Sequence, residues 1–156
     1  MAFCELIESG EIDKLPRIFC AQPANYAPIH ESFQAGLDCQ VSSRFLPTIV
    51  EGAAIKAPIR LAQVLNALNE SAGGTVGVSE YQIFQSLKAL CSKGVYVEPT
   101  SALSVAAYHL LKDEGNLTED QLTIVILTGS GLKATSFMET AFNWSDNYRL
   151  NKNFFI

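Results

Sequence analysis

Two short segments in the C-terminal half of the chain carry the residues whose types and spacing best suit chemistry. The first is an apolar, β-branched run over residues 123–128 that ends in a hydroxyl, Thr128, and opens into Gly129, Ser130 and Gly131. Ligand sites in parallel α/β proteins form where strands end in such turns. Thr128 can therefore donate a hydrogen bond to a ring nitrogen or accept one from it, and the two glycines would leave room for a ligand.

The second segment is residues 98–102, Glu-Pro-Thr-Ser-Ala, between an extended apolar piece and a helix that Thr100 or Ser101 would cap. A carboxylate at a helix N-terminus is favoured by the helix dipole, so Glu98 could orient a ligand. Both segments also have a structural interpretation, with Thr128 as a helix cap and Glu98 as an exposed residue of a capping motif. Local spacing alone favours the structural interpretation, because a single Gly-X-Gly is a common turn.

The sequence gives little support for a metal site, a set of catalytic residues or an anion site. His30 and His109 lie in separate predicted helices without a second ligand at i+3 or i+4, so no metal site is expected. No serine–histidine–acid set, carboxylate pair or phosphate loop can be assembled, and we expect no catalytic residue in this chain. Lys133 follows the glycine turn and is expected to be an exposed helix lysine rather than an anion ligand.

Composition limits the class of protein. The chain has 156 residues, 48% hydrophobic and 17% charged, with a net charge of −5, which predicts one folded domain over residues 1–156 with an aromatic tail over 142–156. The absence of a basic block argues against nucleic-acid binding, and no apolar stretch approaches the ~20 residues of a membrane span. Four widely spaced cysteines and no signal peptide predict a cytoplasmic protein.

The pattern of elements predicts an α/β fold. Strands are predicted at 17–22, 75–78 and 123–128, and helices at 25–35, 58–72, 80–92, 100–112 and 132–141. Their alternation predicts a three-layer α/β/α arrangement with a small, mainly parallel sheet. A thin sheet and a low charge leave apolar surface to be covered, so we expect a homo-oligomer or a missing part of the same polypeptide as partner.

Five segments resemble, in the same order, the C-terminal portion of the threonine synthases. These are pyridoxal-phosphate (PLP) enzymes of the tryptophan synthase β fold type, called fold type II. The resemblance covers nearly all of residues 2–141, and it is carried by residues 10–22, 48–55 with Pro58, 77–83, 94–102 and 127–133. The last two segments are the most specific.

The resemblance implies roles for individual residues. Thr128 matches the hydroxyl that binds the PLP pyridine nitrogen, with Gly129 beside it and Glu98 close to the cofactor ring. A neutral hydroxyl suits elimination and replacement chemistry, because it does not hold the ring nitrogen protonated as a carboxylate would. Residues 48–55 would face the substrate through Thr48, Ala53 and Ala54. The implied reaction converts O-phosphohomoserine and water into threonine and phosphate, and threonine at 128 favours it over the dehydratases.

The departures from the family pattern are equally specific. None of the seven lysines stands in the Ser-Phe-Lys-Asp-like motif of the family's Schiff-base lysine, and the Gly-Asn-rich phosphate loop is missing. Val50 and Ala134 replace the commoner alanine and aspartate. The chain alone is therefore expected to be inactive and to bind PLP only together with a missing N-terminal part or a second subunit. The alternatives are a non-catalytic interaction or regulatory module, a small-molecule binding domain, or another fold-type II enzyme such as threonine dehydratase.

Overall fold

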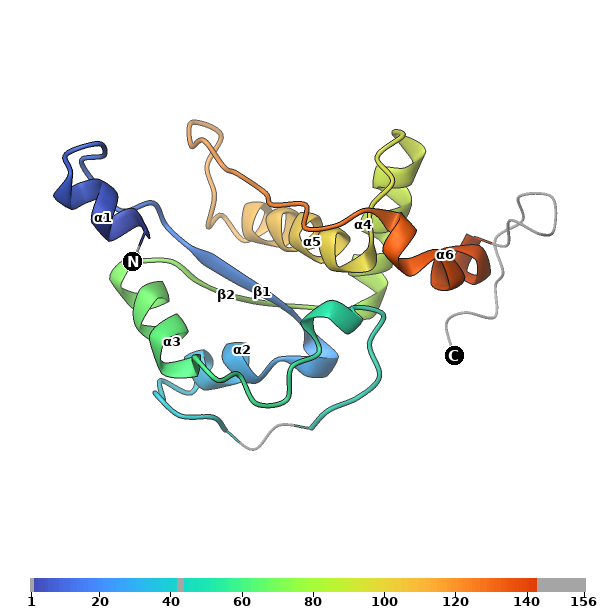
Figure 1. The fold of residues 1–156 in the computed structure, drawn as a ribbon, viewed down its shortest axis with the longest axis horizontal. Coiled ribbons are helices and arrows are strands. Elements are labelled where there is room, and N and C mark those ends of the chain that lie inside the picture. The colour runs from blue at the N-terminus through green and yellow to red at the C-terminus, as the bar shows by residue number, and fades with distance from the viewer. Residues whose placement is uncertain (1, 42–43, 143–156) are drawn as a thin grey trace. The chain divides into compact units, whose positions relative to one another are not determined.

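The computed structural model describes residues 2–41 and 44–142, which form two compact units (Figure 1). The first unit ends at Glu80 and the second begins at Tyr81. The predicted aromatic tail lies outside the described residues beyond Phe142. None of the helices in the described ranges has the length and apolar character that crossing a membrane requires.

A two-stranded parallel sheet organises the first unit. The strands β1 (Phe19–Pro23) and β2 (Gly74–Val78) pair in register from Phe19 opposite Gly74 to Pro23 opposite Val78. The connection between them carries α2 (Pro28–Gln34) and α3 (Leu61–Glu70), which pack on the sheet and on each other; α1 (Ala2–Glu8) precedes β1. The predicted α/β class with a small parallel sheet is confirmed.

The buried side chain of Gln22 joins the sheet to α2. Its Oε1 accepts hydrogen bonds from the backbone N–H groups of Ile29 (2.9 Å) and His30 (3.0 Å). These two groups lie in the first turn of α2 and would otherwise have no partner in the helix. Gln22, a residue of β1, therefore caps the N-terminus of α2.

The helix predicted over residues 25–35 is confirmed only from Pro28 onward. Asn25 lies in a 3-10 turn, Ala24–Tyr26, and its Nδ2 donates to the carbonyl of Pro47 (2.7 Å). The helix begins later, at Pro28, because proline is pre-set for the first helical position and lacks the N–H that would need a partner.

The helix predicted over residues 58–72 is confirmed as α3 with shorter bounds. The helix buries Leu61, Leu65 and Leu68, but Ile59 is 99% exposed because the helix begins only at Leu61. After the helix, the backbone of Gly73 approaches Ile18 so closely that a Cβ on Gly73 would overlap the Ile18 carbonyl oxygen. Glycine at this place lets the chain turn from α3 directly into β2.

Helices dominate the second unit. They are α4 (Glu80–Ser92), which starts at the last residue of the first unit, α5 (Pro99–Asp113) and α6 (Thr135–Phe142), with a 3-10 turn at Gly131–Ala134. The helices predicted over 80–92, 100–112 and 132–141 are thus confirmed with small shifts. Pro99 at the first position and Glu98 before it replace the predicted cap at Thr100 or Ser101.

The strand predicted over residues 123–128 is wrong. This segment joins no β-ladder in the described part of the chain; an isolated antiparallel bridge between Val97 and Ser130 follows it. Leu122, Ile124 and Ile126 are 93%, 81% and 70% exposed. The apolar, β-branched composition favours an extended backbone, but a strand needs neighbours, and the second unit presents helices and turns.

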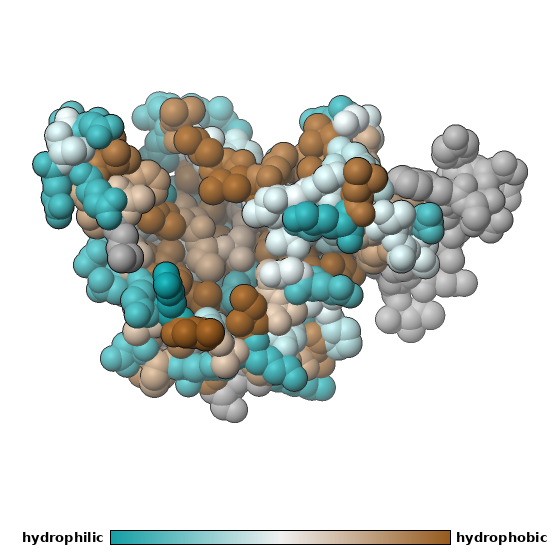
Figure 2. All heavy atoms as spheres, in the orientation of Figure 1, coloured by the Kyte–Doolittle hydropathy of each residue, from teal (hydrophilic) through white to brown (hydrophobic). Residues whose placement is uncertain are grey.

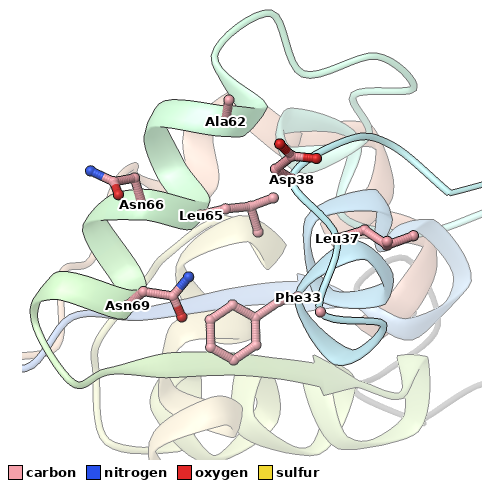
Figure 3. Close-up of a pocket in the computed structure, with 8 residues that line it drawn as sticks. Phe33, Leu37, Asp38, Ala62, Leu65, Asn66 and Asn69 are labelled. Carbon is pink, nitrogen blue, oxygen red and sulfur yellow. The ribbon is translucent and has the colours of Figure 1, made fainter.

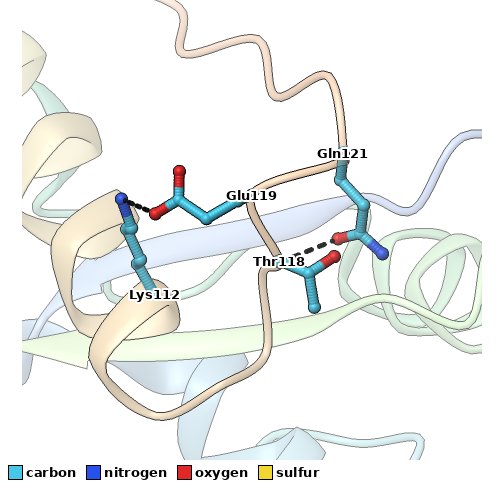
Figure 4. Close-up of polar contacts among 4 residues, drawn as sticks. All are labelled: Lys112, Thr118, Glu119 and Gln121. Atoms are coloured by element: carbon cyan, nitrogen blue, oxygen red, sulfur yellow. Dashed lines mark hydrogen bonds and ion pairs between the residues drawn. The ribbon is translucent and has the colours of Figure 1, made fainter.

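A hydrogen-bonded turn precedes this segment (Figure 4). The N–H of Thr118 donates to Oε1 of Gln121 (3.3 Å), and the N–H of Gln121 donates to the carbonyl of Thr118 (3.2 Å). Lys112 near the end of α5 forms an ion pair with Glu119 (2.7 Å). Both partners are exposed, so the pair contributes little stability, but it directs the chain as it leaves α5.

His30 ties α2 to the sheet a second time. Its Nδ1 lies 2.9 Å from Oγ1 of Thr75 on β2, and a Cβ on Gly77 would lie 3.1 Å from the His30 ring. Burial lowers the pKa of His30 below its usual 6.5, and Glu31 opposes this shift. The folded state therefore prefers the neutral ring.

We predict that His30 makes the fold sensitive to mild acid. Because its pKa is lower in the folded state, its contribution is fully present above pH 6.5 and is lost as the pH falls from there through the folded pKa. Urea unfolding at pH 7.5 and 5.5 should show a smaller loss of stability for His30→Asn than for the wild type. His109→Asn, at an exposed position, is the matched control. Equal losses for wild type and His30→Asn would contradict this role.

Candidate functional site

The segment around Thr128 and Gly129 lies against the start of α5 in the second unit. An antiparallel bridge pairs Val97 with Ser130. Two backbone hydrogen bonds flank it, from Glu98 N–H to Gly129 O (3.1 Å) and from Gly131 N–H to Tyr96 O (3.2 Å). The two segments singled out in the sequence are therefore joined to each other.

Ser101 fixes the position of Gly129. Its side chain is fully buried in the first turn of α5; its Oγ accepts from the N–H of Gly129 (3.0 Å) and donates to the Gly129 carbonyl (3.1 Å). One hydroxyl thus satisfies both backbone groups of one residue. Sequence reasoning considered Ser101 only as a helix cap. A serine among the apolar residues of a helix's first turn was the signal that could have found it.

Thr128 and Glu98 form the polar surface of the site. Oγ1 of Thr128 donates to Oε1 of Glu98 (3.2 Å) and lies 3.4 Å from Oγ of Ser101. Because the Ser101 proton goes to Gly129, the Thr128 proton is free to go to Glu98. Thr128 is exposed and Glu98 is partly exposed, so both can be reached from outside. The structure thus brings together Glu98, Thr128 and Gly129.

The predicted capping by Thr128 is wrong, and Glu98 stands at an N-cap position without making a capping bond. The N-cap of the Gly131–Ala134 turn is Ser130, whose Oγ accepts from the N–H of Leu132 (3.3 Å). Glu98 occupies the N-cap position of α5, but its side chain makes no capping bond and instead accepts from Thr128. The polar atoms of Thr128 and Glu98 are therefore available for interactions other than helix capping.

The two glycines permit close packing within the site. A Cβ on Gly129 would overlap the Glu98 carboxylate, and a Cβ on Gly131 would lie 2.7 Å from the Tyr96 ring. Desolvation is the main cause that raises the pKa of the Tyr96 phenol, so a neutral ring rests on Gly131. The expectation that the glycines make room for a ligand is corrected: they make room for Glu98 and Tyr96.

The predicted substrate-facing residues belong to the first unit. Thr48 Oγ1 accepts from the N–H of Val50 (3.1 Å), and Ala53 and Ala54 lie half-buried at the 3-10 turn Glu51–Ala53. These three residues form a local group of their own.

Glu80 holds this group in place. Its Oε2 accepts from the N–H of Ile49 (2.9 Å), while its Oε1 is buried without a hydrogen-bond partner among the described residues. The carboxylate therefore anchors the start of residues 48–54 and keeps one oxygen able to accept a further bond.

The donor set around Thr128 suits an uncharged nitrogen heterocycle. The exposed hydroxyl of Thr128, which donates to Glu98 (3.2 Å), can donate to a ring nitrogen instead when it turns away from that carboxylate. A metal ion would need more ligands, and residues 2–41 and 44–142 contain no cluster of three histidine, cysteine, aspartate or glutamate side chains that could hold one. The pyridine ring of PLP fits this donor set.

Comparison with known proteins agrees with this chemistry. A family profile described as "Pyridoxal-phosphate dependent enzyme" matches residues 2–129. Threonine synthase of Methanocaldococcus jannaschii is 33% identical over 132 residues, which cover 84% of this chain and 33% of that protein. Threonine synthase of Synechocystis sp. is 32% identical over 134 residues, 85% of this chain and 32% of that protein. The chain thus spans about a third of the length of the curated relatives it matches.

Solved structures show the same fold. Maize serine racemase superposes with a TM-score of 0.56 at 22% identity, over 79% of this chain and 38% of that one. A threonine deaminase from T.th. superposes with a TM-score of 0.53 at 20% identity, over 73% of this chain and 39% of that one. At these identities the likeness concerns the fold alone.

We predict that Ser101→Ala destabilises the second unit by about 1 kcal/mol, because the half-buried N–H of Gly129 loses its partner and the Gly129 carbonyl keeps only the hydrogen bond from the Glu98 N–H. Chemical denaturation should detect this loss. Ser104→Ala in the same helix is the matched control, since Ser104 is only partly buried, and it should change stability by less than about 0.5 kcal/mol. Equal effects of the two substitutions would show that the Ser101 hydroxyl does not hold Gly129.

Proposed function

The chain belongs to the family of pyridoxal-phosphate dependent enzymes, and from that premise we propose that it forms part of a threonine synthase. The reaction would convert O-phosphohomoserine and water into threonine and phosphate. Two observations support this proposal: the identity of 33% and 32% to threonine synthases, and an exposed threonine hydroxyl held by a carboxylate. The Thr128–Glu98 pair is the observation that carries it.

Bound PLP would supply an electron sink for elimination and replacement at the substrate's carbon atoms. The chain's own part is to orient the cofactor ring. Thr128 carries a single hydroxyl proton; to donate it to a ring nitrogen, the hydroxyl turns away from Glu98 and leaves that nitrogen unprotonated. Ser101 keeps Thr128 and Gly129 in place while this happens, because its bonds reach the Gly129 backbone.

The first unit would contribute the substrate-facing residues. In this proposal Thr48, Ala53 and Ala54 face the substrate, and Glu80 holds their segment through the N–H of Ile49.

The same proposal includes a cytoplasmic location, which the four widely spaced cysteines favour.

The chain by itself would lack activity. None of its lysines stands in the motif of the family's cofactor-binding lysine, so the covalent attachment of PLP would come from outside these 156 residues. The chain's span of about a third of its curated relatives is consistent with this division.

We predict that the isolated chain releases no phosphate from O-phosphohomoserine in the presence of PLP. A chimera in which this chain replaces the matching third of the Methanocaldococcus jannaschii enzyme should do so. In the chimera, Thr128→Val should lower kcat/KM roughly tenfold, the loss of about one hydrogen bond, while Thr128→Ser retains most of it. Thr123→Val, at another exposed hydroxyl of the same segment, is the control.

The outcomes separate the alternatives. Phosphate release by the isolated chain would refute its inactivity. A chimera that makes a 2-oxo acid from L-threonine and releases no phosphate would point to a dehydratase-type enzyme instead. Unchanged kinetics in Thr128→Val would remove Thr128 from the cofactor site.

A non-catalytic interaction module is the second candidate, and the exposed segment 122–127 favours it. Its apolar side chains lie on the surface that Figure 2 shows, and no backbone hydrogen bond within the described part of the chain involves residues 122–127. Such a segment can accept a strand from a missing part of the enzyme or from a second copy. Either function therefore implies a partner at this place, and a homo-oligomer is the form we propose for the isolated chain.

We predict that the isolated chain self-associates through this segment. The double substitution Ile124→Ser with Ile126→Ser should shift light scattering toward the monomer, because it removes two side chains that are 81% and 70% exposed. Ile59→Ser removes a single isoleucine that is 99% exposed in the first unit and should leave association unchanged. A monomeric wild type, or equal shifts for both variants, would contradict this use of the segment.

A further inference from the structure

A cavity of about 300 Å³ lies in the first unit, between the end of α2 and the outer side of α3 (Figure 3). None of its lining residues belongs to the Thr48 group or to the Thr128 site. It is therefore a separate feature of the fold. Its volume is at the lower end of the range of small-molecule pockets, which suits a ligand of about the size of an amino acid.

The base of the cavity is apolar. Leu65 is 4% exposed, and the ring of Phe33 and the methyl group of Ala62 complete this surface. An apolar group of a ligand would cover these side chains and remove their surface from water.

Among the residues that line the cavity, Asp38 alone carries a charge, and that charge is negative. The Asp38 carboxylate and the Asn69 amide lie at opposite ends of the view in Figure 3, with Leu65 between them. Asp38 makes no ion pair or hydrogen bond with any residue of the described ranges, and no lysine or arginine lines the cavity. The Asn66 amide is already occupied, because it donates to Glu70 (2.8 Å). Among the described residues, the Asp38 carboxylate therefore has no counterion, and it lies at the edge of a cavity with an apolar surface.

The turn after α2 holds Asp38 there. Gly36 has a φ of +67°, a conformation that glycine adopts without strain, and it reverses the chain directly after the helix. Leu37 and Asp38 follow this turn and reach the edge of the cavity. The N–H of Leu37 donates to the carbonyl of Ser32 (3.1 Å), which attaches this turn to α2 directly before Asp38.

We propose that this cavity binds a small organic ammonium compound with a short apolar group, such as a branched alkylamine or an apolar amino acid. The ammonium group pairs with Asp38, and the apolar group lies on Phe33, Leu65 and Ala62. The Asn69 amide accepts or donates one hydrogen bond at the other end of the ligand. A metal ion is a poor fit, because a single carboxylate supplies too few oxygen ligands, and an anion is repelled.

The test compares three compounds of one shape on the wild-type chain: 3-methylbutylamine, 3-methylbutanol and 3-methylbutanoate. NMR titration should show shifts of the Asn69 side-chain amide with the amine. Binding of the alcohol and the acid should be at least about threefold weaker, as expected for loss of an exposed ion pair. L-Leucine separates the two sources of the ligand: binding as tight as the amine indicates an amino acid, and weaker binding indicates a simple amine.

Substitution of Asp38 tests the charge directly. Asp38→Asn keeps the shape and should weaken the amine about threefold to fivefold without affecting the alcohol. Asp13→Asn, at another exposed aspartate of the first unit, should leave amine binding unchanged. Equal affinities for amine, alcohol and acid, an unchanged affinity in Asp38→Asn, or the absence of any shift at Asn69 would each overturn the proposal.

Discussion

A single buried hydroxyl holds the candidate site together. Ser101 lies in the first turn of α5 and exchanges two hydrogen bonds with the backbone of Gly129, 28 residues further along the chain. Burying a hydroxyl is unfavourable unless it is hydrogen-bonded, and the half-buried backbone of Gly129 supplies both a donor and an acceptor for the Ser101 hydroxyl. Thr128 gains its position next to Glu98 from this contact, since it directly precedes Gly129. The surface that could meet a cofactor ring therefore depends on a serine that touches no ligand itself.

In the first unit, too, one side chain hydrogen-bonds the backbone of another element. Gln22 on β1 supplies the acceptor for the start of α2, and His30 in that turn reaches back to Thr75 on β2. The sheet has two strands, so these polar contacts add to a small apolar core. These contacts attach α2 to both strands. The turn at Gly36 and the cavity beside it lie at the end of this helix.

Much of the fold could be predicted from the sequence. Both strands of the sheet and the long helices follow from periodicity and from the positions of proline and glycine. Residues 123–128 could not be predicted correctly, because their composition reports only a preference for an extended backbone. Whether such a run becomes a strand depends on neighbours, and the second unit places turns and helices around it. The capping role first favoured for Thr128 was wrong for a related reason: Ser130 takes the capping position that Thr128 would have had.

The sequence by itself determined the types of most elements, the segments that resemble a PLP enzyme and the pair of segments predicted to carry the chemistry. These properties depend on residues that are close along the chain, so local spacing is enough to show them. The tertiary structure decided which donor meets which acceptor: Thr128 with Glu98, Ser101 with Gly129, and Gln22 with the start of α2. Two of these contacts join residues about 30 positions apart, and only the packing of the folded chain can choose between partners at that distance.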